Sequence, residues 1–312
     1  MRAATIRDGE IFVQEHPDPR PGAGQVLVRV HGAGLNGADM MQRRGLYPAP
    51  PGWPQDIPGM EVAGEVAALG AGAERFRPGD RVMAIVGGGG QAELAVVHER
   101  ELMPVPAGLS WAQAGGLPEV FLTAHDALFT QARLRPGERL LVHGGAGGVG
   151  TAAIQIGGAA GASVTATVRR EELRAEVAAL GAEVLDPEGF QEHGPFDVVL
   201  ELVGAPNIAA DVAALATGGR IVVIGIGAGA RTEIDLRWLM GKRVRLQGST
   251  LRARPPEEKA LASRHVEREL LPLFLAGRLR VPLAATFPLA AVADAYERFA
   301  AGGKLGKIVL EA

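Results

Sequence analysis

Hydrophobic residues in the first third of the chain fall into short runs that Pro and Gly separate. The runs are RAATI, QVLVRV, VAGEVAAL, DRVMAIV and AELAVV, and polar residues interrupt several of them at alternate positions. Short, partly alternating runs between turn residues are typical of β-strands. We therefore predict a β-rich domain over residues 1–117.

The pattern changes after Pro118, where apolar runs begin to alternate with segments of helical spacing. The apolar runs are RLLVH, SVTATV, EVLD, FDVVLEL, RIVVIGIG and RVRLQGS, and the helical segments between them start near Thr151, Glu171 and Asn207. Six strands with intervening helices predict a doubly wound parallel sheet, the Rossmann arrangement, over residues 118–256.

The C-terminal segment has helical spacing from about Pro256 and closes with the strand-like sequence GKIVL. We assign this segment to the first domain, so that residues 1–117 and 257–312 form one domain into which residues 118–256 are inserted. With 312 residues, of which 47% are hydrophobic and 21% are charged, the chain is long enough for two hydrophobic cores.

The segment Leu140–Val168 contains no Asp, Glu, Lys or Arg. It is longer than the about 20 apolar residues that a membrane-spanning helix needs. Its Gly, Thr, Gln and Ser residues and its order of strand, turn, helix and strand favour a unit buried inside a parallel sheet, whose strands are covered on both faces. We predict no membrane partner.

Composition and charge narrow the class of partner. A net charge of −3 provides no basic excess for nucleic acid, so we expect a small-molecule partner. Cysteine is absent, which excludes disulfides, thiolate metal sites and cysteine nucleophiles. The charged N-terminal sequence MRAATIRDGE lacks the apolar core of a signal peptide, and we predict a cytoplasmic location.

Three glycines of the sequence VHGGAGGVGTAAIQ, Gly145, Gly147 and Gly150, have the spacing G-x-G-x-x-G between a predicted strand and a predicted helix. In that context one glycine permits a tight turn, one lets the backbone approach a pyrophosphate, and one lets helix and strand pack closely. Amide hydrogens and the dipole at the helix N-terminus bind the negative charge. We predict a dinucleotide-binding turn; the alternative is a tight turn with no ligand.

The end of the second predicted strand distinguishes between the two nicotinamide dinucleotides. A carboxylate normally holds the ribose hydroxyls of NAD at this position, which here is Val168. Arg169 and Arg170 follow, and guanidinium groups can hold the 2′-phosphate of NADPH. We predict NADPH rather than NADH. The alternative is that both arginines are exposed residues at a helix start, partly neutralised by Glu171 and Glu172.

Several segments together resemble one family. In chain order they are GAGLNGADMMQRRGLYPAPP, IPGMEVAGEV, PGDRV, LPEVFLTAHDALF, VHGGAGGVGTAAIQ, LRWLMGKRVRLQGSTLR and GKLGKIVL. Over nearly the whole chain this series is similar to the zinc-free quinone oxidoreductase (zeta-crystallin) branch of the medium-chain dehydrogenase/reductases. The resemblance implies a GroES-like catalytic domain, a Rossmann domain, an active-site cleft between them and a homodimer.

The same resemblance implies roles for individual residues. Asn36 and Thr123 should lie near the nicotinamide, and Lys307 should reach the cofactor from the first domain. Tyr47 should line the acceptor pocket, with plain packing as the alternative. The backbone positions it assigns are those along the pyrophosphate, Ala146, Gly147, Gly148 and Val149, and those under the nicotinamide, Ile224, Gly225 and Ile226.

Zinc-dependent relatives bind their catalytic metal through a cysteine and a histidine at positions that align with Asn36 and Met60. Neither residue makes a standard zinc site, and no histidine has an HxxxH or similar spacing, so we predict no metal. An unactivated alcohol needs a Lewis acid to lose a proton and a hydride together, whereas a quinone or an enone is electron-poor enough to take reducing equivalents from NADPH without one. We predict an NADPH-dependent quinone oxidoreductase, with an enone reductase and a non-catalytic NADPH-binding protein as alternatives.

Some residues near the predicted site have two interpretations. His125 and His143 are either proton donors or packing residues. Glu201 either bonds under the cofactor turn or caps the end of the sheet. Gly157 and Gly158 lie inside the predicted phosphate-binding helix, where glycine is unfavourable, and we interpret both as sites of close packing.

The last strand of the predicted sheet, RVRLQGS, lies at its edge, where unpaired backbone groups favour association with another strand. Pairing with the same strand of a second copy would cover this edge. We therefore predict a homodimer through the edge strand of the Rossmann domain.

Overall fold

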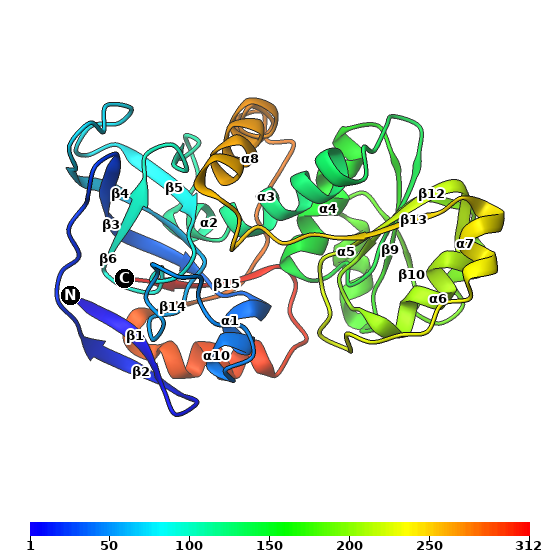
Figure 1. The fold of residues 1–312 in the computed structure, drawn as a ribbon, viewed down its shortest axis with the longest axis horizontal. Helices are drawn as coiled ribbons and strands as arrows, with labels where there is room; N and C mark the ends of the chain where they lie inside the picture. The colour runs from blue at the N-terminus through cyan, green and yellow to red at the C-terminus, as the bar shows by residue number, and fades with distance from the viewer. The chain divides into compact units, whose positions relative to one another are not determined.

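The computed structural model describes all residues from 1 to 312 and consists of two compact units (Figure 1). The first unit comprises residues 1–122, 251–302 and 307–312, and the second comprises residues 123–250 and 303–306. The second unit is thus an insertion in the first, and the chain returns to the first unit at its C-terminal end.

The first unit contains a large sheet with strands from both ends of the chain. The strand order is β14-β15-β3-β4-β5-β7, and β6 also pairs with β3. Val26, Val28 and Val30 of β3 are almost completely buried, because alternate side chains of a strand point to one face. The bounds are β3 (Gln25–Gly34), β4 (Glu61–Leu69), β5 (Arg81–Ile85), β6 (Leu94–His98), β7 (Met103–Pro104), β14 (Leu283–Pro288) and β15 (Lys307–Glu311).

A hairpin and several helices complete the first unit. The hairpin joins β1 (Arg2–Arg7) to β2 (Glu10–Glu15), a strand that the sequence analysis missed. Tyr296 is fully buried in one core cluster with Ile308 and Leu310 of β15, and this anchors the predicted closing strand beside β3 (Figure 1). The helices are α1 (Gly37–Arg43), α2 (Trp111–Gly115), α8 (Pro256–Glu269), α9 (Leu271–Leu275) and α10 (Val292–Ala300), and α3 (Pro118–His125) begins in this unit.

The second unit contains a six-stranded sheet in which every neighbouring pair is parallel, as the alternation of strands and helices predicted. The strand order is β10-β9-β8-β11-β12-β13. Leu140, Leu141 and Val199 are fully buried because both faces of the central strands are covered. The bounds are β8 (Arg139–Val142), β9 (Ser163–Thr167), β10 (Glu183–Leu185), β11 (Phe196–Glu201), β12 (Leu215–Val223) and β13 (Arg245–Gly248).

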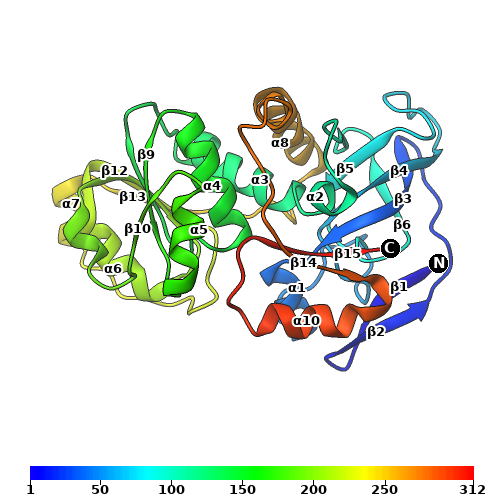
Figure 2. The ribbon, with the colours of Figure 1, turned by 180° about the vertical axis from the view of Figure 1, so that it is seen from behind.

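Helices cover this parallel sheet, as Figure 2 shows. The helix α4 (Gly148–Ala159) packs against β8 and β9, and α5 (Arg174–Ala178) packs against β10. The helix α6 (Ala205–Ala214) contacts β11 and β12, and α7 (Leu236–Lys242) contacts β12. None of the helices combines the length and the apolar character that crossing a membrane requires.

Helix starts differ from the sequence predictions. The helix predicted from Thr151 begins at Gly148, because its first turn is built from glycines that give no apolar periodicity. The segment from Glu171 begins as a 3₁₀ turn before α5, and α3 continues as a π-helix, Asp126–Gln131.

The two glycines inside α4 have different surroundings. A Cβ added at Gly157 would lie 2.7 Å from Cδ2 of Leu140, whereas a Cβ added at Gly158 would have no heavy atom within 4 Å. Close packing is therefore confirmed as the interpretation for Gly157 and is wrong for Gly158, which faces open space.

Candidate nucleotide-binding and catalytic sites

The glycine turn of the second unit connects β8 to α4. The N–H of Gly147 donates to the carbonyl of Gly144 (3.0 Å), and the N–H of Gly145 donates to the carbonyl of Thr167 at the end of β9 (3.0 Å). Gly147 is extended and caps α4. The first amides of α4 have no acceptor within the helix, so they are available to an anion at this end of the sheet.

Each glycine of the turn is required for a different reason. A Cβ at Gly145 would lie 2.9 Å from Cβ of Ala166, and one at Gly150 would lie 2.4 Å from the carbonyl oxygen of Gly144. A Cβ at Gly147 would have only that carbonyl nearby, at 3.3 Å. Gly145 and Gly150 are thus needed for packing within the protein, whereas Gly147 leaves space through which a phosphate can approach the backbone.

The first charged residues after β9 are two arginines. Val168 is 3% exposed, and Arg169 and Arg170 are exposed. Nη1 of Arg170 lies 3.2 Å from Oε1 of Glu172. Sequence reasoning missed Arg174, whose Nε donates to the carbonyl of Val168 (3.0 Å). This third guanidinium beside the end of β9 is already paired with Asp186.

The turn after β12 is packed on the end of β11. The N–H groups of Ile224 and Gly225 donate to the carbonyl of Glu201 (2.9 and 3.1 Å). A Cβ at Gly225 would lie 2.1 Å from the carbonyl oxygen of Leu202, so this position requires glycine. Ile226 is 44% exposed, an apolar surface next to the turn. Thr123, the other predicted contact of this unit, is buried in α3.

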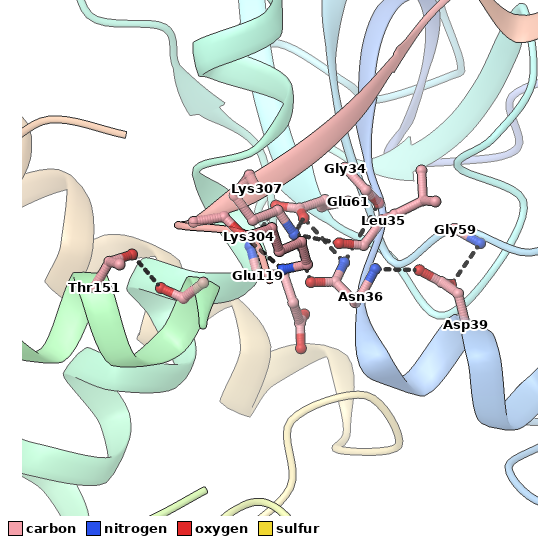
Figure 3. Close-up of polar contacts among 12 residues, drawn as sticks. Gly34, Leu35, Asn36, Asp39, Gly59, Glu61, Glu119, Thr151, Lys304 and Lys307 are labelled. Carbon is pink, nitrogen blue, oxygen red and sulfur yellow. Dashed lines mark hydrogen bonds and ion pairs between the residues drawn. The ribbon is translucent and has the colours of Figure 1, made fainter. Parts of the chain in front are cut away.

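In the first unit, Asn36 stands at the start of α1, and both ends of its amide are bonded (Figure 3). Nδ2 donates to Oε1 of Glu61 (2.9 Å), and Oδ1 accepts from Nζ of Lys307 (2.6 Å). Nζ of Lys307 also donates to the carbonyl of Leu35 (2.8 Å) and lies 2.6 Å from Oε1 of Glu61. The ammonium therefore has three acceptors within this unit. The predicted contact of Lys307 with the cofactor stays a prediction and would require one of these bonds to be exchanged.

Glycine at position 34 makes this network possible. A Cβ added to Gly34 would lie 2.2 Å from Oε1 of Glu61. Glu61 and Lys307 are 0% and 2% exposed, so the ion pair is removed from water. Buried charges of this kind persist only when they are paired and hydrogen-bonded.

Two further carboxyl groups belong to the same region. Oδ2 of Asp39 accepts from the N–H of Asn36 (2.8 Å), and Oδ1 accepts from the N–H of Gly59 (3.1 Å). Burial raises the pKa of Asp39 to about 6, against the effect of these two donors and of Lys307. Figure 3 shows the side chains of Asn36 and Asp39 on opposite sides of the turn that starts α1.

Glu119 lies in the first turn of α3, and its carboxyl group has a strongly raised pKa. Its N–H donates to Oε2 of Glu61 (2.9 Å), and its side chain is only partly exposed. Burial and the neighbouring charge of Glu61 raise the pKa of Glu119 to about 8, although Lys307 lowers it. The Glu119 carboxyl group therefore carries a proton at neutral pH.

Tyr47 is held by Arg252, which is 4% exposed. Nη1 of Arg252 donates to the carbonyl of Tyr47 (3.0 Å), Nε donates to the carbonyl of Gly87 (2.8 Å), and Cζ lies 5.1 Å from the centre of the Tyr47 ring. Partial burial raises the pKa of the Tyr47 phenol, and Arg252 opposes this shift. The ring thus has a packing partner, and its role in lining an acceptor pocket stays a prediction.

A cavity of about 700 Å³ lies elsewhere in the first unit. Its lining includes Trp53, His98, Arg254 and Lys259, and neither Asn36 nor Tyr47 belongs to it. This cavity therefore does not coincide with the residues that the sequence assigned to chemistry.

Sequence reasoning missed Glu61, Glu119 and Arg252, although all three lie in or beside the segments that carried the family resemblance. A signal was present, because each is a charged residue between apolar or small neighbours, and charged residues are rarely buried unless they are paired. The motifs were used to identify a family, and the single charges inside them were not weighed.

Two family models match the chain. The alcohol dehydrogenase GroES-like domain matches residues 22–107, and the zinc-binding dehydrogenase family matches residues 148–268. The chain is 33% identical to the quinone oxidoreductase of Mus musculus over 94% of its length and 90% of the relative, and the same figures describe the quinone oxidoreductase of Homo sapiens. The chain belongs to the quinone oxidoreductase branch of the medium-chain dehydrogenase/reductases. It is an oxidoreductase of that superfamily.

Solved structures support the fold of this medium-chain dehydrogenase/reductase. An alcohol dehydrogenase superfamily protein from Novosphingobium aromaticivorans has a TM-score of 0.89 and 33% identity, covering 100% of this chain and 99% of that one. A thermostable alcohol dehydrogenase from Pyrobaculum aerophilum has a TM-score of 0.86 and 30% identity with the same coverage. The predicted fold class, a GroES-like β-rich domain with a Rossmann sheet, is confirmed.

Proposed function

We propose that this protein is an NADPH-dependent quinone oxidoreductase that works without zinc. The observation that carries the proposal is the hydrogen bonding of the Asn36 side-chain amide, which accepts from Lys307 and donates to Glu61. The chain that holds this amide is 33% identical to a quinone oxidoreductase. The oxygen of this amide already accepts from the Lys307 ammonium, and a carboxamide is not among the Cys, His, Asp and Glu ligands that bind zinc. Met60, at the other position that holds zinc in relatives, is 3% exposed and apolar.

The glycine turn supports a dinucleotide as the cofactor. Gly147 leaves the open approach to the amides of α4, and Ala146, Gly148 and Val149 are the neighbouring backbone positions assigned to the pyrophosphate. We assign the 2′-phosphate to Arg169 and Arg170. The reacting end is assigned to Asn36, Thr123, Lys307 and the turn Ile224–Ile226, as the family resemblance implies.

The proposed reaction needs one proton from the protein or solvent. When bound, the nicotinamide supplies a hydride, which carries two electrons, and reduction of a quinone to a hydroquinone consumes that hydride and one proton. We propose Glu119 as the proton donor, because its pKa of about 8 keeps the carboxyl group protonated at neutral pH. After the transfer, the Glu119 carboxylate regains its proton from water.

The alternatives are an enone reductase and a non-catalytic NADPH-binding protein. An enone takes the same hydride at carbon and the same proton, so Glu119 serves either acceptor. The test is the rate of NADPH oxidation with 1,4-benzoquinone, with 9,10-phenanthrenequinone and with a panel of enones. Turnover confined to enones favours the enone reductase. Tight NADPH binding with no oxidation across both panels overturns catalysis and favours the binding protein.

We also propose that the protein acts in the cytoplasm and that it is a homodimer, as predicted from the edge strand. The support for the dimer is that β13 pairs only with β12 and that Leu246 on this strand is 38% exposed.

A further inference from the structure

A buried imidazole and two carboxyl groups lie together at one end of the parallel sheet in the second unit. His143 directly follows β8, Glu201 ends β11, and Asp211 belongs to α6. All three side chains are 0% exposed, and one nitrogen or oxygen atom from each lies within 4.8 Å of the others. With no contact to solvent, His143 cannot deliver a proton to a substrate, so this cluster needs another explanation.

The imidazole is fixed on both sides. Nε2 of His143 lies 2.7 Å from Oδ1 of Asp211, and Nδ1 lies 2.9 Å from Oγ1 of Thr167. Nε2 is 4.0 Å from Oε2 of Glu201, and the ring meets Phe190 edge-on at 4.6 Å between centres. An ionised Oδ1 of Asp211 can only accept, so Nε2 of His143 carries the hydrogen in the tautomer that matches it.

Two oxygen atoms of the cluster have no hydrogen-bond partner, Oδ2 of Asp211 and Oε2 of Glu201. Two ionised carboxylates this close in a dry core would repel each other, and each bare oxygen would lose its hydration without replacement. One proton shared between the two carboxyl groups removes both problems, because one oxygen then donates and the other accepts. Burial and the neighbouring Glu201 favour this proton, because both raise the pKa of Asp211 above its ordinary value, against the effect of His143.

A metal ion fits this cluster less well than a proton. The 2.7 Å between Nε2 of His143 and Oδ1 of Asp211 is a hydrogen-bond length. Two ligands on one tetrahedral zinc ion, each at about 2.0 Å from the metal, lie about 3.3 Å from each other.

Three turns meet at this cluster. Oε1 of Glu201 accepts from the N–H groups of Val203 and Gly204. The backbone carbonyl of Glu201 accepts from the N–H groups of Ile224 and Gly225. A Cβ added at Gly144 would lie 3.6 Å from both Leu202 and Val203, so the glycine turn rests on the same segment. His143 immediately precedes that turn. The cluster therefore fixes the turns 144–150, 202–204 and 224–226 relative to one another.

We propose that His143, Asp211 and Glu201 are positioning residues for dinucleotide binding, and that one proton shared by the two carboxyl groups holds the turns 144–150 and 224–226 in register. This inference rests on the proposed function in one respect, since that function assigns both turns to the cofactor. The proton itself is a property of the unliganded protein and is tested there.

Conservative and disruptive variants distinguish a shared proton from simple filling of space. Asp211→Asn and Glu201→Gln each replace a protonated carboxyl group by an amide that accepts on one side and donates on the other. Asp211→Leu leaves the His143 N–H and the Glu201 oxygen without partners. We expect the dissociation constant for NADPH to stay within about threefold of the parent for the two amide variants and to rise about tenfold or more for Asp211→Leu. Asp197→Asn, at the opposite end of β11, is the matched control and should leave the dissociation constant unchanged.

Infrared spectroscopy of the protein without cofactor tests the proton directly. The test uses a Glu119→Gln background, which removes the other carboxyl group that carries a proton at neutral pH. This protein should show the C=O stretching band of a buried carboxylic acid that persists at neutral pH. The band should be lost when Asp211→Asn or Glu201→Gln is added, but not when Asp197→Asn is added. Hydrogen exchange of the amides of residues 144–150 and 203–225 should accelerate in Asp211→Leu alone. The proposal is overturned by an absent band, by equal damage from Asp211→Asn and Asp211→Leu, or by stoichiometric metal removable from these ligands. A parent that binds neither NADPH nor NADH refutes the proposed function, while the band and the exchange rates still decide about the cluster.

Discussion

Arg169 and Arg170 are the residues on which the proposed choice of cofactor depends. Both are exposed, and the buried Val168 stands between them and β9, at the position where a carboxylate normally holds the ribose of NAD. The contact of Arg170 with Glu172, at 3.2 Å, is a surface ion pair of about 0–1 kcal/mol. Arg170 can therefore exchange Glu172 for a phosphate at small cost.

We predict that the double variant Arg169→Ala with Arg170→Ala loses its preference for NADPH. Each charge-assisted contact contributes about 1.5–3 kcal/mol, so the dissociation constant for NADPH should rise by roughly two orders of magnitude or more. The dissociation constant for NADH should hardly change, and high salt should imitate the variant. Arg135→Ala, an exposed arginine just before β8, is the control. Equal losses for both cofactors, measured by fluorescence titration, would mean that the pair is only a solvated helix start.

Glu119 should make the protein less stable as the pH rises. The pKa of its carboxyl group is about 8 in the folded protein against an ordinary value of 4.5. Between these values the unfolded chain has lost the proton that the folded protein keeps, so the contribution of this group to the free energy of unfolding falls through this window. Glu119→Gln should remove that fall. Urea denaturation at about pH 5 and about pH 8 measures this fall. The change in the free energy of unfolding with pH follows the difference in bound protons between the unfolded and folded states. Glu171→Gln controls for the loss of one carboxyl group. If the free energy of unfolding of Glu119→Gln depended on pH as that of the parent does, the raised pKa of Glu119 would be contradicted.

The same variant tests the proposed proton donor by kinetics. A positioned general acid contributes about 10²–10⁴ in rate, so Glu119→Gln should lower kcat with a quinone by at least about 10². The dissociation constant for NADPH should stay the same, because the cofactor is assigned to other residues. Stopped-flow measurement of NADPH oxidation gives the rate, and a loss confined to NADPH binding would assign Glu119 a structural role instead.

Among single residues, Asn36 could be identified as a site residue from the sequence, but its hydrogen-bond partners could not be predicted. The residue lay in a motif with a known counterpart, whereas its partners Glu61 and Lys307 come from segments far away in the chain. Only the fold brings β4 and β15 to the end of β3. The raised pKa of Glu119 depends on the same assembly, since its causes are burial and the charge of Glu61.

Among the secondary structure elements, the parallel strands were the most predictable part. Strands covered on both faces must be apolar throughout, and this leaves an unmistakable run in the sequence. The start of α4 was missed by three residues, Gly148 against Thr151, because a first turn made of glycine and valine around a phosphate site has no apolar period. The strand β2 was missed because only Ile11 of its six residues is fully buried, so its pattern is weak.

Two glycines of α4 give opposite predictions for the same substitution. Gly150→Ala places a Cβ 2.4 Å from the backbone oxygen of Gly144, which no side-chain rotation relieves, so the turn must move and NADPH binding should fall by at least about tenfold. Gly158→Ala meets no atom within 4 Å and should raise the free energy of unfolding by about 1 kcal/mol without affecting binding. Thermal denaturation and NADPH titration of both variants test the pair. Comparable effects of the two substitutions on NADPH binding would rule out this account of the turn.

For the whole molecule, the sequence located the inserted sheet because its pattern differs from that of the flanking segments. The strand GKIVL was returned to the first domain because it stands alone after a helical segment. Association between copies is a different matter, since no sequence pattern distinguishes an edge strand that pairs with a second copy from one that faces water. The exposed apolar side chains of α7, the helix before β13, are the additional information: Leu236, Trp238 and Met240 are 66%, 50% and 77% exposed.

We predict that the protein is a dimer whose two sheets meet at β13, and that charge at this edge separates the copies. Single apolar side chains on a surface are normal, but three on one short helix just before the edge strand β13 mark an interaction site. A two-fold axis places each substituted residue near its own counterpart, so Leu246→Lys with Met240→Lys brings like charges together. Light scattering should give the mass of two chains for the parent and of one chain for the double variant, with unchanged circular dichroism. Leu261→Lys adds a charge at a 57% exposed leucine of α8 and should leave the dimer intact. A parent that is monomeric and active when dilute, or a double variant that stays dimeric, would exclude this edge as the interface.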